Sequence, residues 1–230
     1  RTTSATGYAA YQGLVELIET LTERAAMLWK MKAADVDFKD GVFFPKSDPE
    51  LRLGFKQLAA KLDGTGGPIA STASVDLSSA GSAFAVHIVD LEVDPETGKT
   101  DVVRYTAVQD AGKAVHPSYV ESQIQGGVSQ GIGWALNEEY FMTGEGVMAN
   151  SSFLDYRMPT ALDLPMIETI VVEVPNPLHP FGVRGVGEVP LAPPLPAVAN
   201  AIYDATGVRL RELPMKPGKI LEALAKENGR

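Results

Sequence analysis

Residues 182–190 are the part of this sequence that most restricts the fold, because they combine closely spaced glycines with proline. Three glycines fall within six positions and lead directly to Glu188 and Pro190, and Pro193, Pro194 and Pro196 follow. Glycine permits positive φ and close approach of the backbone, whereas proline fixes φ and removes a hydrogen-bond donor. The stretch therefore predicts an irregular, stiff loop, which precedes a helical pattern over residues 197–205.

Glu188 is a candidate catalytic residue because a carboxylate on a fixed loop can act as a general base. The alternative is a glycine-rich turn whose glutamate simply faces water, since short glycine patterns are weak signals. The stretch by itself leaves both interpretations open.

A second glycine-rich segment is expected to be a helix over residues 118–139. It contains Gly126, Gly127, Gly131 and Gly133. Each interior glycine costs a helix roughly 1 kcal/mol relative to alanine, so four of them require a reason. Close packing against another element is one explanation and approach to a bulky ligand is another, and the two are compatible.

The first seven residues, Arg-Thr-Thr-Ser-Ala-Thr-Gly, are small and polar. They precede an amphipathic helical pattern that carries Leu14, Leu17, Ile18 and Leu21. Hydroxyls and amides before a helix N-terminus form a potential anion site. Ordinary capping by Ser4 or Thr6 is the alternative.

The remaining pattern predicts an α+β fold, with mixed and antiparallel sheets layered with helices. Asp40-Gly41 indicates a hairpin over residues 36–44, and Asp48-Pro49 is expected to open a helix. Strands are predicted at residues 83–94, 102–108 and 167–174, and helices at 197–206 and 217–226. We expect two lobes, one of residues 1–80 with 180–230 and one of residues 81–179.

Charge and composition exclude several classes of function. The net charge of −9 argues against nucleic acid and anionic membrane surfaces as partners. The chain has no cysteine, which excludes an iron–sulfur cluster held by its own thiolates. Its three histidines, His87, His116 and His179, are scattered, so we expect no metal held by protein ligands. Because the chain begins at Arg1 without a methionine, we expect a fragment, a processed subunit or the ordered part of something longer.

Several phrases together resemble the molybdenum-binding subunits of the xanthine dehydrogenase and aldehyde oxidase family. They are Val-Asp-Pro-Glu-Thr-Gly at 93–98, Gln-Ile-Gln-Gly-Gly-Val-Ser-Gln-Gly-Ile-Gly at 123–133, Phe-Leu-Asp-Tyr-Arg-Met-Pro at 153–159 and Gly-Val-Gly-Glu-Val-Pro-Leu at 185–191. His116, Ser122 and Gln125 depart from the residues usual in that family. The resemblance therefore identifies a family and no particular subfamily.

This resemblance implies the fold of a molybdopterin-binding domain from the C-terminal half of a large subunit, here residues 1–230. It implies a molybdopterin cofactor carrying molybdenum, usually as the cytosine dinucleotide in bacterial members. Glu188 would be the general base. The cofactor would be bound by Gln130, Gly187 and the N-terminal residues Thr2, Thr3, Ser4, Ala5, Thr6 and Gly7, and no protein atom would ligate the metal.

The resemblance also implies the reaction and the partners. An N-heterocycle or aldehyde would be oxidised with water as the oxygen source, in a cytoplasmic, multi-subunit oxidoreductase. A 2Fe–2S subunit and an FAD-containing flavin subunit would carry electrons away, and the N-terminal half of the large subunit would complete the site. One alternative is a non-catalytic structural subunit of such a complex. Another is a glycine-loop nucleotide enzyme, although the loop lacks the lysine that such enzymes use.

Overall fold

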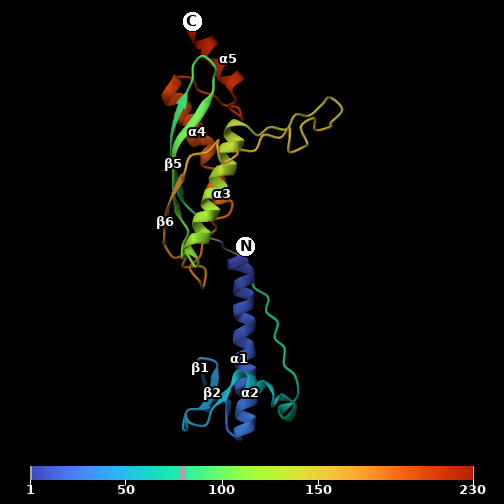
Figure 1. Cartoon of the computed structure of the whole chain (residues 1–230). Helices are drawn as coiled ribbons and strands as arrows, with labels where there is room; N and C mark the ends of the chain where they lie inside the picture. The colour runs from blue at the N-terminus through green and yellow to red at the C-terminus, as the bar shows by residue number, and fades with distance from the viewer. Residues whose placement is uncertain (1, 78–80, 230) are drawn as a thin grey trace. The chain divides into compact units, whose positions relative to one another are not determined.

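The structure, a computed structural model, describes residues 2–77 and 81–229. The chain divides into two compact units, residues 1–78 and residues 79–230 (Figure 1). Arg1, the first residue of the predicted polar segment, lies outside the described residues.

The first unit consists of one long helix with a small sheet beside its C-terminal half. A π-helical turn, η1 (Thr2–Thr6), leads into helix α1 (Gly7–Trp29), which ends at Lys30 with a positive φ of 55°. Its other elements are the 3₁₀ turns η2 (Ala33–Asp35) and η3 (Leu62–Thr65), the strands β1 (Val36–Lys39), β2 (Val42–Pro45) and β3 (Leu53–Gly54), and helix α2 (Phe55–Ala59).

The predicted hairpin is confirmed. β1 and β2 pair in antiparallel register, and Asp40 and Gly41 both have positive φ, as a two-residue turn between twisted strands requires. The helix predicted from Asp48 was wrong in its start. Residues 48–51 form turns in which the Asp48 carboxylate accepts from the Glu50 amide, and the chain then pairs with β2 as β3 before α2 begins at Phe55.

The core of the first unit lies at the C-terminal half of α1. Leu21 and Ala25 are buried there against Phe43 of β2 and Leu58 of α2. Beside the N-terminal half of α1 runs an irregular segment that includes Ser71, whose Oγ donates to the Gly13 carbonyl at 2.7 Å (Figure 1). Tyr11 and Leu14, on this half of α1, are half exposed.

The second unit is a three-stranded sheet with helices on one face (Figure 1). The strands are β4 (Ala85–Val93), β5 (Thr100–Asp110) and β6 (Ile167–Val172), in that order. The helices are α3 (Pro117–Leu136), the short η4 (Val189–Leu191), α4 (Pro194–Thr206) and α5 (Pro217–Asn228). Between α3 and β6, the chain extends away from the sheet as a long arm (Figure 1).

The sheet is mixed, which confirms the predicted α+β class. β4 and β5 form an antiparallel pair, whereas β6 runs parallel to β5. A parallel neighbour needs a long crossover connection, and α3 together with the arm provides it. Within the part of the chain that the structure describes, no helix combines the length and apolar character needed to cross a bilayer.

The predicted grouping of residues 180–230 with residues 1–80 differs from the structure, which places residues 180–230 in the second unit. Apolar packing explains the difference. Val198 and Ile202 of α4 and Ile220 of α5 are buried in the same core as Ile124 and Val128 of α3. The residues after 180 therefore complete the layer of helices that covers the sheet.

His87 on β4 predicts a pH dependence of stability. Its Nδ1 lies 2.9 Å from the Tyr105 hydroxyl, and burial lowers the pKa of His87 to about 4. The unfolded chain, with an ordinary histidine pKa near 6.5, therefore binds a proton more readily than the folded chain. We expect the free energy of unfolding to fall as pH drops from about 6.5 towards 4.

Urea unfolding at several pH values in this window checks this expectation. His87→Gln cannot take up the proton, so its unfolding free energy should change less with pH than that of the wild type. His116 is exposed, so His116→Gln is the matched control. Its unfolding free energy should change with pH as much as that of the wild type. Equal slopes for the wild type and His87→Gln would contradict the assignment.

Candidate functional site

The glycine-rich loop of residues 182–188 is fixed to the end of β5 by backbone hydrogen bonds. The Lys113 amide donates to the Gly182 carbonyl at 2.7 Å, and the Arg184 amide donates to the Ala111 carbonyl at 3.0 Å. Gly112 and Val183 pair between these two bonds as an antiparallel bridge. The predicted stiff loop is thus held at its start like a short extra strand.

Beyond the loop, the chain lies directly against glycines of α3. A Cβ added at Gly127 would lie 2.5 Å from Cγ of Pro190, and one at Gly131 would lie 2.6 Å from the Leu191 carbonyl oxygen and from Cγ of Pro194. These distances are shorter than real Cβ contacts allow. Close packing therefore explains Gly127 and Gly131, where it joins the segment after the loop to the helix. It also explains Gly133, where an added Cβ would lie 2.6 Å from Cδ of Pro159.

Glu188 lies where the loop meets this contact. It occupies the N-cap of η4 without a side-chain capping bond, and its side chain is exposed. Gly187, beside it, is close to α3, since an added Cβ would lie 3.4 Å from Oε1 of Gln123. The structure therefore brings Gly187 and Glu188 alongside the N-terminal half of α3.

Gln130 lies on the face of α3 that remains exposed. Gln123, Gly126, Gln130 and Trp134 are exposed at three- and four-residue spacing, which puts them on one stripe of the helix. A Cβ added at Gly126 would meet no atom within 4 Å. At about 1.5 Å of rise per residue, Gln130 lies about 10 Å along the axis from Gln123, so the stripe passes from the Glu188 loop to Gln130.

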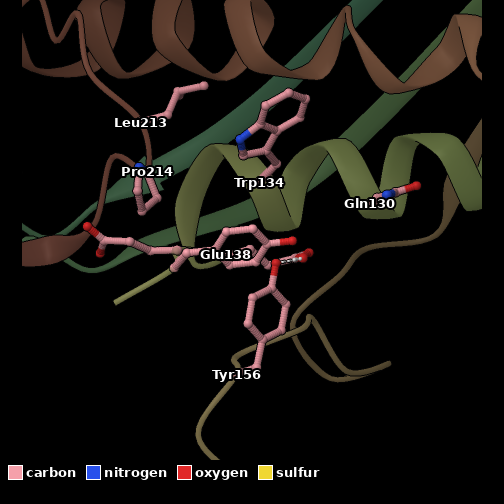
Figure 2. Close-up of a pocket in the computed structure, with 8 residues that line it drawn as sticks. Gln130, Trp134, Glu138, Tyr156, Leu213 and Pro214 are labelled. Carbon is pink, nitrogen blue, oxygen red and sulfur yellow. Dashed lines mark hydrogen bonds between the residues drawn. The ribbon is translucent and has the colours of Figure 1, made fainter. Parts of the chain in front are cut away.

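A cavity of about 390 Å³ adjoins Gln130 at the C-terminal end of α3 (Figure 2). It is lined by Gln130, Trp134, Glu138, Glu139, Tyr140, Tyr156, Leu213 and Pro214. The Tyr156 hydroxyl donates to Oε2 of Glu138 at 2.8 Å. Desolvation, followed by this bond to a carboxylate, raises the pKa of Tyr156 to about 12. Tyr156 is therefore a neutral donor at physiological pH.

The predicted N-terminal site belongs to the first unit. Thr2, Thr3, Ser4, Ala5 and Thr6 form η1, and Gly7 begins α1. Thr6 is the N-cap residue but makes no side-chain capping bond. The hydroxyl-bearing residues Thr2, Thr3 and Thr6 are exposed. Capping by Thr6, one alternative explanation of this segment, is thus not what the structure shows.

The available side chains suit a large polar ligand better than a bare metal ion. The side-chain amides of Gln123 and Gln130 make no hydrogen bond within the described residues. A side-chain amide can both donate and accept. Across residues 2–77 and 81–229, no three histidine, cysteine, aspartate or glutamate side chains gather in a way that could hold a metal.

The sequence analysis did not single out Gln123, Trp134, Gln109 or Arg184. Gln123 and Trp134 share the exposed stripe of α3 with Gln130, so helical spacing from Gln130 would have identified them. Gln109 contacts the loop, and Arg184 within the loop contacts Asp110 and Ser82, across long sequence separations for which the sequence carries no local signal.

Comparison with protein families matches residues 1–165 to a family described as the molybdopterin cofactor-binding domain. Over 158 residues, the chain is 38% identical to a putative xanthine dehydrogenase molybdenum-binding subunit of Escherichia coli K12, covering 68% of this chain and 21% of that protein. It is 38% identical over 142 residues to an aldehyde oxidoreductase of Megalodesulfovibrio gigas, covering 61% of this chain and 15% of that protein. The chain thus spans about a fifth or less of the length of these two relatives.

Among solved structures, quinoline 2-oxidoreductase from Pseudomonas putida 86 is similar to 90% of this chain. The TM-score is 0.75 and the sequence identity 30%, and the match covers 28% of the matched chain of that structure. The arrangement of helices and sheets described above therefore recurs within a larger protein.

Proposed function

Because the chain belongs to the molybdopterin cofactor-binding domain family, we propose that it forms one side of a molybdopterin site in a hydroxylase and that Glu188 is the general base. The observation that carries this proposal is the attachment of the Glu188 loop to α3. Gly187 lies close to Gln123 and Pro190 lies against Gly127, so the exposed Glu188 between them is held next to the helix that bears Gln130.

The chain's own residues would bind and orient the cofactor. The Gln130 amide would donate to the metal end of the cofactor without adding charge, and Gly187 lets the backbone approach closely. Residues 2–7 would contact its phosphate-bearing end through hydroxyls and backbone amides. Molybdopterin, when bound, supplies the metal that activates water and accepts electrons. Glu188 would accept the proton released from water, as a general base positioned on a fixed loop does.

We propose an N-heterocycle or an aldehyde as the substrate class. The relatives and the similar structure are named for xanthine, quinoline and aldehyde oxidation, and water would supply the oxygen. We also propose that the cofactor is the cytosine dinucleotide form and that the complex is cytoplasmic. Its partner chains would be a 2Fe–2S subunit and an FAD subunit. The remaining part of a large subunit would cover the open face of α3.

Isotope labelling tests this function. The chain is assembled with its partner chains, and quinoline, xanthine and an aromatic aldehyde are each oxidised in ¹⁸O-enriched water. Mass spectrometry should find one ¹⁸O atom in the product of quinoline or xanthine, or at least one in the carboxylic acid formed from the aldehyde, whose carbonyl oxygen also exchanges with water. Oxygen that comes only from dissolved O₂, or no oxidation of any member of the panel, would contradict the proposal.

Gln130→Ala is expected to lower turnover by about 2- to 10-fold, the range expected when one hydrogen bond of about 0.5–1.5 kcal/mol is lost. Because the side chain is exposed and makes no bond within the described residues, the free energy of unfolding should change by less than about 0.5 kcal/mol. Turnover and thermal midpoint are measured together.

Glu121→Ala is the matched control, since Glu121 is exposed on the same helix about half a turn around from Gln130. It should change neither quantity. A large fall in the thermal midpoint of Gln130→Ala with turnover intact would make Gln130 a structural residue.

A further inference from the structure

The loop that carries Glu188 is anchored by an unusually buried ion pair. Nε of Arg184 lies 2.9 Å from Oδ2 of Asp110, and the two side chains are only 11% and 10% exposed. Of the seven ion pairs found among the described residues, this is the most buried. A buried pair contributes little net stability because desolvation offsets the attraction, so fixing a geometry is its better-attested use.

Asp110, at the end of β5, is bound from several sides. Its Oδ1 accepts from the Gly112 amide at 2.9 Å and from the Val174 amide at 3.2 Å, while its Oδ2 faces Arg184. The carboxylate therefore joins β5 to the segment that follows β6. These two amide bonds hold the Asp110 carboxylate in place independently of Arg184.

The Arg184 guanidinium extends these connections. Its Nε also donates to the Val174 carbonyl at 3.2 Å, and its Nη1 donates to the Ser82 carbonyl. One side chain thus holds together the end of β5, the segment after β6 and the segment before β4. Lysine has a single ammonium group and cannot place donors at both the Nε and Nη1 positions.

Gln109 holds the loop from the next position on β5. It is fully buried, and its Nε2 donates to the Gly185 carbonyl at 3.4 Å. With the Arg184 amide bonded to Ala111, both Arg184 and Gly185 are fixed just ahead of Glu188. Gly187 and Glu188 then continue towards α3.

We propose that Arg184, with Asp110 and Gln109, is a positioning residue that sets the location of Glu188 over α3. The proposal rests on the proposed function, since it concerns the loop that carries the general base. Arg184 does not touch the reacting atoms in this account. It acts by keeping residues 182–188 in one conformation.

The first measurement is hydrogen exchange of the peptide spanning residues 182–188 in the assembled complex. Arg184→Lys keeps the charge but loses one of the two donors, and Arg184→Met removes both. We expect amide exchange in this peptide to rise at least tenfold in Arg184→Met and by a smaller factor in Arg184→Lys. If Arg184→Met fails to fold, the milder Arg184→Lys still decides the outcome.

Kinetics supply the second measurement. In the same variants, kcat normalised to bound molybdenum should fall at least tenfold in Arg184→Met, while KM stays within about threefold of the wild type. Arg184→Lys should have a kcat between those of Arg184→Met and the wild type. A general loss of fold would not lower kcat while leaving KM nearly unchanged.

Arg104→Met is the matched control. Its Nε also meets a carboxylate, Oδ2 of Asp90 at 2.7 Å, but the two side chains are 70% and 48% exposed. This variant should leave both the exchange of residues 182–188 and kcat unchanged. Arg184 variants with wild-type exchange would overturn the positioning role, and so would faster exchange with an unchanged kcat.

The experiments distinguish a failure of the proposed function from a failure of the positioning role of Arg184. If Glu188→Gln were fully active, Glu188 would not be the base, and the kinetic part of the positioning role would be overturned with it. Exchange would still show whether Arg184 fixes the loop, because that measurement needs no turnover.

Discussion

Glu188→Gln is expected to lower the molybdenum-normalised turnover of the assembled enzyme by at least about 10²–10⁴-fold, the contribution typical of general acid–base catalysis. Glutamine keeps the size and hydrogen-bonding capacity of the side chain but cannot accept a proton at physiological pH. Because Glu188 is exposed and makes no capping bond to η4, its replacement should alter stability by less than about 0.5 kcal/mol. Molybdenum content should stay near that of the wild type.

Glu92→Gln is the control for a change of charge. Glu92 lies on β4 with an exposed side chain and pairs with Asp101, at the end of β5 opposite to Asp110 and the loop. Its replacement should leave turnover unchanged. If Glu188→Gln also stayed within a few-fold of the wild-type rate, Glu188 would be a solvated loop residue and the proposed mechanism would be wrong.

Alanine at Gly127 or Gly131 is expected to destabilise the second unit by about 1–3 kcal/mol, the usual cost of inserting a methyl group into a packed contact. The new Cβ would lie 2.5 Å from Cγ of Pro190 at the first position and 2.6 Å from the Leu191 carbonyl oxygen at the second. A proline ring and a backbone oxygen cannot rotate away, so α3 and the segment of residues 190–194 would have to separate. Urea unfolding measures this effect.

Gly126→Ala is the matched control on the same helix. Its new Cβ would meet no atom within 4 Å, so the gain in helix propensity should stabilise the protein by up to about 1 kcal/mol. Opposite signs at Gly126 and Gly127 would show that contact, and not helix propensity, decides the outcome. Equal destabilisation at all three glycines would contradict the packing account.

Local sequence signals predicted the elements that depend on local chemistry. Asp40-Gly41 specified the turn between β1 and β2, because both residues tolerate positive φ. The glycines of residues 126–133 marked a helix that something approaches closely, and Pro190 and Pro194 are what approach it at Gly127 and Gly131. Both features are encoded within a few neighbouring residues.

Long-range features were not predictable in the same way. The parallel pairing of β6 with β5 joins residues about 60 positions apart, and no turn residue specifies it. The ion pair between Asp110 and Arg184 likewise depends on packing of the whole second unit. The buried apolar residues of α4 could pack in either predicted lobe, so the sequence did not decide where residues 180–230 belong.

In the candidate site, too, local features could be predicted from the sequence and long-range contacts could not. Glu188 and Gln130 were named from motifs, and the structure connects their segments through the contact of Pro190 with Gly127. The residues that fix the loop, Gln109 and Arg184, became identifiable only when the strands had been placed. Catalytic candidates could be found from sequence phrases, whereas the contacts that hold the loop in place required the fold.

Metal analysis tests the central claim most directly. The chain is expressed with its partner chains in cells supplied with molybdenum, and the purified complex is analysed for molybdenum and for the released pterin nucleotide. We expect about one molybdenum and one pterin per copy of this chain, in the wild type and in Glu188→Gln alike. A complete, folded complex that contains neither would contradict the account and favour a non-catalytic structural subunit.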